Sequence, residues 1–134
     1  MLRKVILLIS VILLASCSSK NMSDPDCKAS YELAERVLGN QAKHFTFEKL
    51  EGVEGDVFEL SSDGSDIIIK GTNANSMAVG LNHYLRYYCN VVYSWFHYDK
   101  MELPDRLPKV EAPVRHQARV KDRFFLNYCT YGYT

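Results

Sequence analysis

The chain has 134 residues with 16 basic and 16 acidic side chains, so its formal net charge is zero. A length of this order allows one domain and little more. A balanced charge without basic runs also lacks the electrostatic footprint of a nucleic-acid-binding protein, and no nucleic-acid partner is expected.

Residues 1–16 have the pattern of an export signal. Arg3 and Lys4 precede an apolar run over residues 5–15, which only Ser10 interrupts. Such a run, as a helix, reaches about 16 Å, which is roughly half of the ~30 Å hydrocarbon core of a membrane. The run therefore fits a signal peptide better than a spanning helix.

The sequence L-A-S-C at residues 14–17 resembles the lipobox of bacterial lipoproteins. The resemblance implies that Cys17 becomes the first mature residue and carries a lipid, which attaches the protein to a membrane surface by an anchor. Ordinary secretion with an unmodified Cys17 is the alternative. Residues 17–24 would form a polar tether, and because Ser18 and Ser19 do not resemble an inner-membrane retention signal, the outer membrane of a bacterial envelope is the expected location.

Two segments have the apolar spacing of amphipathic helices. Asp24, followed by proline, can cap a first helix over residues 25–38, and a glycine stands just past its end. A second helix is predicted over about residues 75–88, with Asn73 or Asn75 as its cap.

Four short segments are predicted to be strands. Residues 44–48, 57–60 and 66–70 alternate or are rich in isoleucine, and short turns join them, which favours an antiparallel meander. Residues 91–95 are β-branched and aromatic and predict a fourth strand. The element order α-β-β-β-α-β predicts an α+β fold in which two helices cover one face of a small antiparallel sheet.

Residues 99–119 differ in character from the preceding sequence. Pro104, Pro108 and Pro113 alternate with charged residues, which predicts an extended, non-helical linker. Residues 120–127 then look like one further strand.

Residues 67–80 predict a strand, a turn and a helix, which is the setting of a phosphate-binding loop. A Walker loop also requires a second glycine and a lysine before the Ser or Thr, and Ser76 lacks both. We therefore interpret this turn as structural, with Gly80 allowing close helix packing.

The histidines and cysteines give no metal or redox pattern. His44, His83, His97 and His116 are scattered without metal-ligand spacing, so no metal and no cofactor are expected. His83 is predicted to be partly buried, whereas His44 and His116 are predicted to face solvent.

Three cysteines follow the lipid site, at Cys27, Cys89 and Cys129. Their odd number leaves at least one free thiol. A bridge between Cys27 and Cys89 stays open as an alternative, although unpaired buried cysteine is the more common state.

The aromatic residues between positions 84 and 98 allow two interpretations. They could line a sugar-stacking surface, or they could pack a corner between helix and strand, and aromatic residues at such spacing are more often core. The set comprises Tyr84, Tyr87, Tyr88, Tyr93, Trp95, Phe96 and Tyr98.

Several motifs in order along the chain resemble one enzyme family. The segment from residue 71 to residue 95 contains the pattern G-L-x-x-Y-L-R-x-x-C, two Leu-Pro pairs follow, and the chain closes on N-x-C-T-x-x-Y. From about Ser30 to Thr134 the sequence is similar to the N-terminal region of α-N-acetylglucosaminidases, glycoside hydrolase family 89.

This resemblance implies a function and a division of the chain. In that family a small α+β domain precedes a (β/α)₈ catalytic barrel, and the enzyme removes terminal α-linked N-acetylglucosamine with retention, using two barrel glutamates that would lie beyond Thr134. The chain on its own would then be an inactive N-terminal fragment of the enzyme. The expected division is signal peptide 1–16, tether 17–24, α+β domain 25–98, linker 99–119 and the start of the barrel at 120–134.

The resemblance also implies substrate-binding residues and leaves a second function open. Asn127, Cys129 and Tyr133 lie on the closing motif, at the end of what would be the first barrel strand, where barrel active sites are built. The glycan would thus be bound mainly through the barrel. The alternative is a free-standing envelope module that binds carbohydrate or another partner without catalysis.

Overall fold

A computed structural model of the chain describes residues 22–93 and 103–123. Helix α2 (Pro25–Leu38) continues into a short 3-10 helix, η1 (Gly39–His44), and helix α3 spans Ala74–Tyr87. The strands are β1 (Phe45–Lys49), β2 (Val57–Asp63), β3 (Asp66–Gly71) and β4 (Val114–Gln117). Within these described ranges, neither helix combines the length and the apolar character that a membrane crossing requires.

The two predicted helices are confirmed. Helix α2 has the predicted bounds, and the Asp24 side chain caps it by accepting hydrogen bonds from the backbone N–H groups of Asp26 and Cys27, at 2.9 and 3.0 Å. Helix α3 begins one residue earlier than predicted, and of the two candidate caps the structure uses Asn73.

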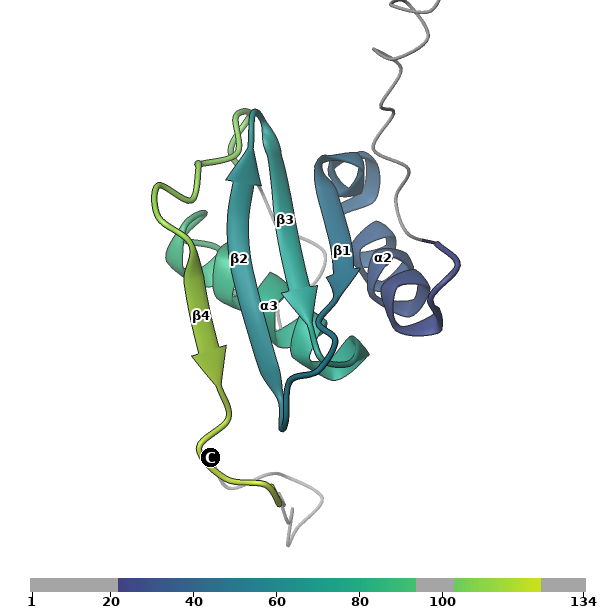
Figure 1. Cartoon of the computed structure of the whole chain (residues 1–134). Helices are drawn as coiled ribbons and strands as arrows, with labels where there is room; N and C mark the ends of the chain where they lie inside the picture. The colour runs from purple at the N-terminus through teal and green to yellow at the C-terminus, as the bar shows by residue number, and fades with distance from the viewer. Residues whose placement is uncertain (1–21, 94–102, 124–134) are drawn as a thin grey trace, which may run out of the picture.

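The sheet is mixed, with strand order β1-β3-β2-β4 (Figure 1). Strands β2 and β3 form the predicted antiparallel hairpin, but β1 pairs parallel to β3, so the prediction of an antiparallel meander is wrong. The cause is the connection over residues 50–56, in which Gly52 and Gly55 adopt positive φ. This connection is long enough to pass the end of β3, so β2 lies on the other side of β3 from β1.

The fourth strand does not lie where it was predicted. Val91 to Tyr93 are not in a strand, because the Val91 N–H closes the end of α3 by donating to the carbonyl of Leu85 at 2.9 Å. Residues 94 and 95 lie outside the described part of the chain. The edge strand is β4, which pairs antiparallel with β2.

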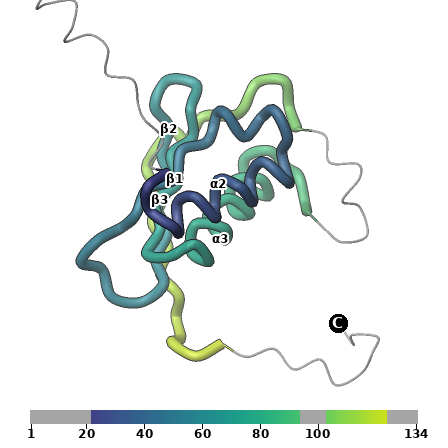
Figure 2. The backbone as a smooth tube through the Cα atoms, turned by 90° about the vertical axis from the view of Figure 1, so that its right-hand side faces the viewer, coloured from purple at the N-terminus to yellow at the C-terminus, as the bar shows by residue number. Residues whose placement is uncertain are grey.

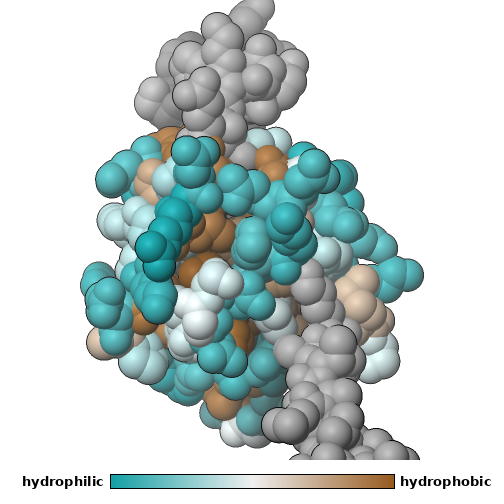
Figure 3. All heavy atoms as spheres, turned by 90° about the horizontal axis from the view of Figure 1, so that it is seen from above, coloured by the Kyte–Doolittle hydropathy of each residue, from teal (hydrophilic) through white to brown (hydrophobic). Residues whose placement is uncertain are grey.

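Both helices cover the same face of the sheet, as predicted (Figure 2). Helix α2 packs on α3 and β1, and α3 packs on β2 and β3. The core between these layers is apolar and includes Cys27, Ala34, Leu38, Phe45, Phe47, Leu60, Ile67, Ile69, Met77, Leu81, Tyr84 and Leu85. From the end of the β2–β3 hairpin, the surface is mostly hydrophilic, with apolar side chains visible between polar ones (Figure 3).

Gly80 allows α3 to lie close to the sheet, as predicted. A Cβ atom at this position would stand 2.9 Å from Cγ2 of Ile69 and 3.3 Å from Cδ2 of Phe58. Both contacts are shorter than ordinary carbon–carbon contacts. The absence of a side chain therefore sets the distance between helix and strands.

The proline-rich segment packs on this core. The Tyr84 hydroxyl donates to the Pro108 carbonyl at 2.7 Å, and the Val110 N–H donates to Oγ of Ser62 at 2.8 Å. Val110 is itself buried. The described part of the segment is non-helical, as predicted, and it contributes Val110 to the core and β4 to the sheet.

Candidate functional site

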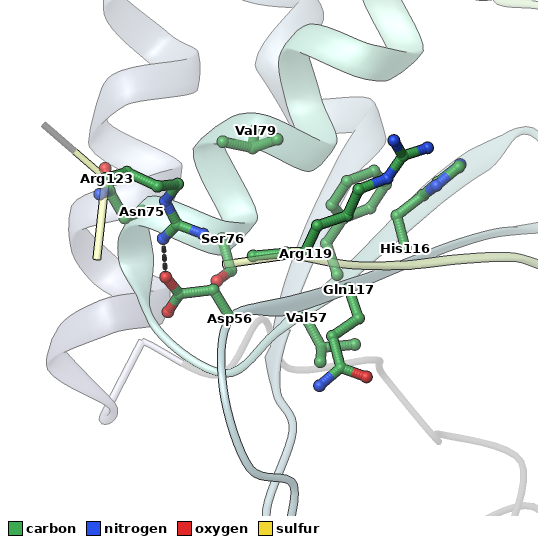
Figure 4. Close-up of a pocket in the computed structure, with 11 residues that line it drawn as sticks. Asp56, Val57, Asn75, Ser76, Val79, His116, Gln117, Arg119 and Arg123 are labelled. Atoms are coloured by element: carbon green, nitrogen blue, oxygen red, sulfur yellow. Dashed lines mark hydrogen bonds and ion pairs between the residues drawn. The ribbon is translucent and has the colours of Figure 1, made fainter. Parts of the chain in front are cut away.

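A cavity of about 340 Å³ lies between the first half of α3 and the segment that contains β4 (Figure 4). Helix α3 contributes Asn75, Ser76 and Val79, while His116 and Arg119 face them from the β4 side. The other lining residues are Asp56, Val57, Phe58, Gln117, Ala118 and Arg123.

Asp56, which directly precedes β2, is bonded both to the turn before α3 and to the segment that follows β4. Its backbone carbonyl accepts a hydrogen bond from the N–H of Ala118 at 2.8 Å. In its carboxylate, Oδ1 accepts from Nδ2 of Asn73 at 2.7 Å, and Oδ2 forms an ion pair with Arg123 (Figure 4). Both carboxylate oxygens are therefore engaged in holding the cavity together.

The turn before α3 is closed by its own side chains. Oδ1 of Asn73 accepts from the Ser76 N–H at 2.8 Å, which satisfies one of the free donors at the helix start. Oγ1 of Thr72 accepts from the Val57 N–H at 3.1 Å and lies 3.2 Å from Oγ of Ser76. These contacts agree with the interpretation of this turn as structural.

Two histidines meet beside the cavity. The rings of His83 on α3 and His116 on β4 lie 4.9 Å apart between centroids. Phe58 and Tyr87 pack on His83 with centroid distances of 5.4 and 4.5 Å. Burial, and then the neighbouring His116, lowers the pKa of His83 below its usual value.

The predictions for His83 and His116 hold, whereas His44, which was predicted to face solvent, is only partly exposed. His83 is half-buried, and His116 is exposed. His44 is half-exposed and lies 3.5 Å from a carboxylate oxygen of Asp66. The packing of His83 against His116 was not predicted, because nothing in the local sequence places β4 next to α3.

The cavity does not have the composition of a glycosidase site. A retaining glycosidase needs two carboxyl groups about 5 Å apart. Among the described residues that line the cavity, Asp56 is the single acid. In residues 22–93 and 103–123, the His, Cys, Asp and Glu side chains also form no group of three that could hold a metal ion.

The predicted binding residues are not placed by the structure. Asn127, Cys129 and Tyr133, and the predicted lipidation site Cys17, all lie outside the described residues. Cys27 and Cys89 are free thiols, so the alternative of a bridge between them is wrong. Burial, followed by the nearby Asp24 carboxylate, raises the pKa of Cys27 to about 11.

The aromatic residues of α3 divide between core and surface. Tyr84 is fully buried, and Tyr88 stacks on it with ring centroids 5.4 Å apart. Tyr87 and Tyr93 are exposed. Trp95, Phe96 and Tyr98 lie outside the described residues. The prediction of a core role is therefore confirmed for Tyr84 and does not apply to Tyr87.

Comparison with known proteins connects this fold to one family. Residues 28–109 match the model of the α-N-acetylglucosaminidase (NAGLU) N-terminal domain. No curated protein matches the chain significantly.

Solved structures of a Clostridium perfringens family 89 glycoside hydrolase are also similar. One, a double Glu-to-Gln variant in complex with its substrate GlcNAc-α-1,4-galactose, is 30% identical with a TM-score of 0.68 over 81% of this chain. Two more, in complex with PUGNAc and with 2-acetamido-1,2-dideoxynojirmycin, are 32% identical with a TM-score of 0.71 over 87% of the chain. The match spans 12% to 13% of the length of those proteins.

Proposed function

The chain belongs to the α-N-acetylglucosaminidase N-terminal domain family, and on this premise we propose that it is the N-terminal part of a retaining exo-glycosidase. The parent enzyme would hydrolyse terminal α-linked N-acetylglucosamine from glycans. The observation that carries the proposal is the family match over residues 28–109. The similar C. perfringens enzyme, whose substrate carries N-acetylglucosamine, supports it.

In this proposal the described domain is a scaffold and the catalytic groups lie elsewhere. The cavity beside α3 offers a single carboxylate, and that carboxylate is bound on both oxygens. The nucleophile and the acid/base would be two glutamates of a barrel that begins at about residue 120. Asn127, Cys129 and Tyr133 would then lie at the rim of the sugar site.

The proposal includes a place in the cell. The apolar run before Cys17 and the L-A-S-C sequence support a lipid anchor in a bacterial outer membrane. Metabolic labelling with an alkyne-tagged palmitate tests this point. Label on the wild-type chain and its loss in Cys17→Ala is the expected result, and equal label in both would refute the anchor.

The enzymatic part is tested with two proteins and one pair of substrates. The first protein is the 134-residue chain, and the second is the complete product of the reading frame that contains it. The two substrates are the α-linked and the β-linked nitrophenyl N-acetylglucosaminide. The complete product should release nitrophenol from the α-linked substrate and not from the β-linked one, whereas the 134-residue chain should release none from either. A complete product without a barrel, or without α-linked activity, would refute the proposal.

One observation favours a second function. Tyr87 is 63% exposed and Tyr93 is 47% exposed, and exposed aromatic faces suit the apolar faces of sugar rings. A stand-alone carbohydrate-binding module would bind glycans by calorimetry as the 134-residue chain and would lose binding in Tyr87→Ala. Absence of binding by the intact chain would exclude this candidate.

A further inference from the structure

Strand β4 is an edge strand that buries little of its own surface. It pairs with β2, and its residues Arg115, His116 and Gln117 are exposed. On the open face of the sheet, Arg115 forms an ion pair with Glu59. Because segments with few buried apolar contacts open locally at a small cost in free energy, the attachment of β4 depends strongly on the contacts of its other face.

On that other face, His116 connects β4 with α3. The strand register places His116 directly opposite Phe58, and the two rings lie 5.2 Å apart between centroids. The His116 ring also lies 4.9 Å from the ring of His83, with an angle of 45° between the ring planes. Two imidazoles therefore meet at the boundary between the helix and the edge strand.

The charged side chains that border this histidine pair are mostly basic. On α3, the ring of Tyr87 packs on His83, and the guanidinium of Arg86 lies 5.7 Å from the centre of the Tyr87 ring. After β4, Arg119 and Arg123 line the adjoining cavity. None of these side chains can supply a negative charge to a protonated imidazole at neutral or mildly acidic pH.

The acids of the surrounding elements are already engaged elsewhere. The Asp56 carboxylate is bonded on both oxygens, and Glu59 pairs with Arg115. On β3, Lys70 pairs with Glu48, in the same row of the sheet register as Glu59. Within the described part of the chain, no carboxylate forms an ion pair with either histidine of the pair.

Protonation of both histidines would place two like charges side by side without a counter-charge. Burial, and then the neighbouring His116, lowers the pKa of His83. The contact therefore stabilises the structure fully above the ordinary histidine pKa of about 6.5, and this effect is lost as the pH falls through the lower pKa of the folded state. Since carboxylates ordinarily titrate near pH 4, histidines are the side chains that change charge between about pH 7 and pH 5.

We propose that His83 and His116 form a pH-sensitive contact that holds β4 against α3 at neutral pH and releases the strand in mild acid. Release would leave most of the core in place, because Val114 is the one residue of β4 that packs against it. Release would also open the cavity beside α3, which is lined partly by β4 and the segment that follows it. This inference concerns the domain itself and is independent of the proposed function.

Amide hydrogen exchange of the 134-residue chain tests the proposal. Protection is measured at about pH 7 and about pH 5 and corrected for the intrinsic exchange rates. The reporters are the amides of β4 and that of Ala118, which donates to the Asp56 carbonyl at 2.8 Å. The amides of β3, which lies inside the sheet, are the internal reference.

Two glutamine variants are compared with the wild type. His116→Gln keeps a polar side chain at an exposed position and cannot become charged. His44→Gln is the matched control, because His44 lies beside Asp66 and directly precedes β1, at the opposite edge of the sheet from β4.

In the wild type, the protection of β4 and Ala118 should fall by about tenfold between the two pH values, whereas that of β3 should stay nearly constant. This factor is the size expected for repulsion between two partly solvated charges at such a separation. His116→Gln should remove most of the loss, and His44→Gln should retain it.

Titration of the His83 ring by NMR gives a second readout, which a merely structural role of His116 would not move. In His116→Gln the pKa of His83 should rise toward its ordinary value, because the neighbouring charge is gone while the burial remains. An unchanged pKa of His83 would show that the two rings do not interact.

Three exchange results would also overturn the inference. Equal protection of β4 at both pH values would mean that the strand is not released. An equal loss of protection in β3 would mean that acid destabilises the whole domain. The same loss in His116→Gln as in the wild type would mean that another group is responsible.

Discussion

Replacement of Gly80 by alanine tests how closely α3 packs on the sheet. In an uncrowded helix the change would stabilise the protein by up to about 1 kcal/mol, because alanine loses less backbone entropy. Here the new Cβ would stand 2.9 Å from Cγ2 of Ile69, whereas carbon atoms in ordinary contact are about 3.5 Å or more apart. The helix or the strand must therefore move by roughly 0.6 Å.

Crowding of this kind typically costs about 1 to 3 kcal/mol. It exceeds the gain in helix propensity, so we expect Gly80→Ala to be less stable than the wild type by about 1 kcal/mol. Urea unfolding followed by circular dichroism measures the difference. Val79→Ala is the control, because it places alanine at the neighbouring position of the same helix, where the side chain is 55% exposed.

A double-mutant cycle isolates the contact itself. Ile69→Ala removes the atom that would crowd the new methyl group, so Gly80→Ala should cost less, or even stabilise, in that background, with a coupling energy of about 1 kcal/mol. If Gly80→Ala stabilises the wild type and shows no coupling to Ile69, the close approach of α3 to the sheet is refuted.

Three further substitutions test individual hydrogen bonds. Asp24→Ala removes the cap of α2 and should cost about 1 kcal/mol of unfolding free energy in urea, while Asp24→Ser should retain most of it. The Asp26 carboxylate has a pKa below its usual 3.8, chiefly through its hydrogen bond from Lys49. It therefore stabilises the fold above about pH 4 and loses this effect as the pH falls, so the deficit of Asp26→Asn in urea unfolding should be present at pH 7 and shrink toward pH 3. Tyr84→Phe removes the donor to the Pro108 carbonyl and should cost about 1 kcal/mol, with faster amide exchange around residue 108; unchanged exchange would contradict the role of this bond.

The local parts of the fold could be predicted because their causes are local. The cap of α2 depends on Asp24 and the two N–H groups that follow it, and the hairpin of β2 and β3 depends on a turn that includes Gly64, which has a φ of 61°. Such signals lie within a few residues of the element that they specify.

The strand pairing could not be predicted, because it depends on residues that are far apart in the sequence. Strand β4 is a polar edge strand of four residues, of which Arg115, His116 and Gln117 are exposed, so it lacks the alternation that marks a half-buried strand. Val91 and its neighbours have the β-branched and aromatic composition of a strand, but the Val91 N–H is used to end α3. Composition alone does not distinguish these two uses.

Helix α3 shows why the exposed residues on its β4 side also escape sequence analysis. Its buried stripe contains Met77, Leu81 and Tyr84, and a periodic pattern of that kind accounts for a helix that covers one face of a sheet. Val79 and Tyr87 belong to a second stripe of the same period, and a sequence cannot tell which of two stripes the fold buries. Only the position of β4, which brings His116 to His83, places the second stripe on an exposed edge of the domain.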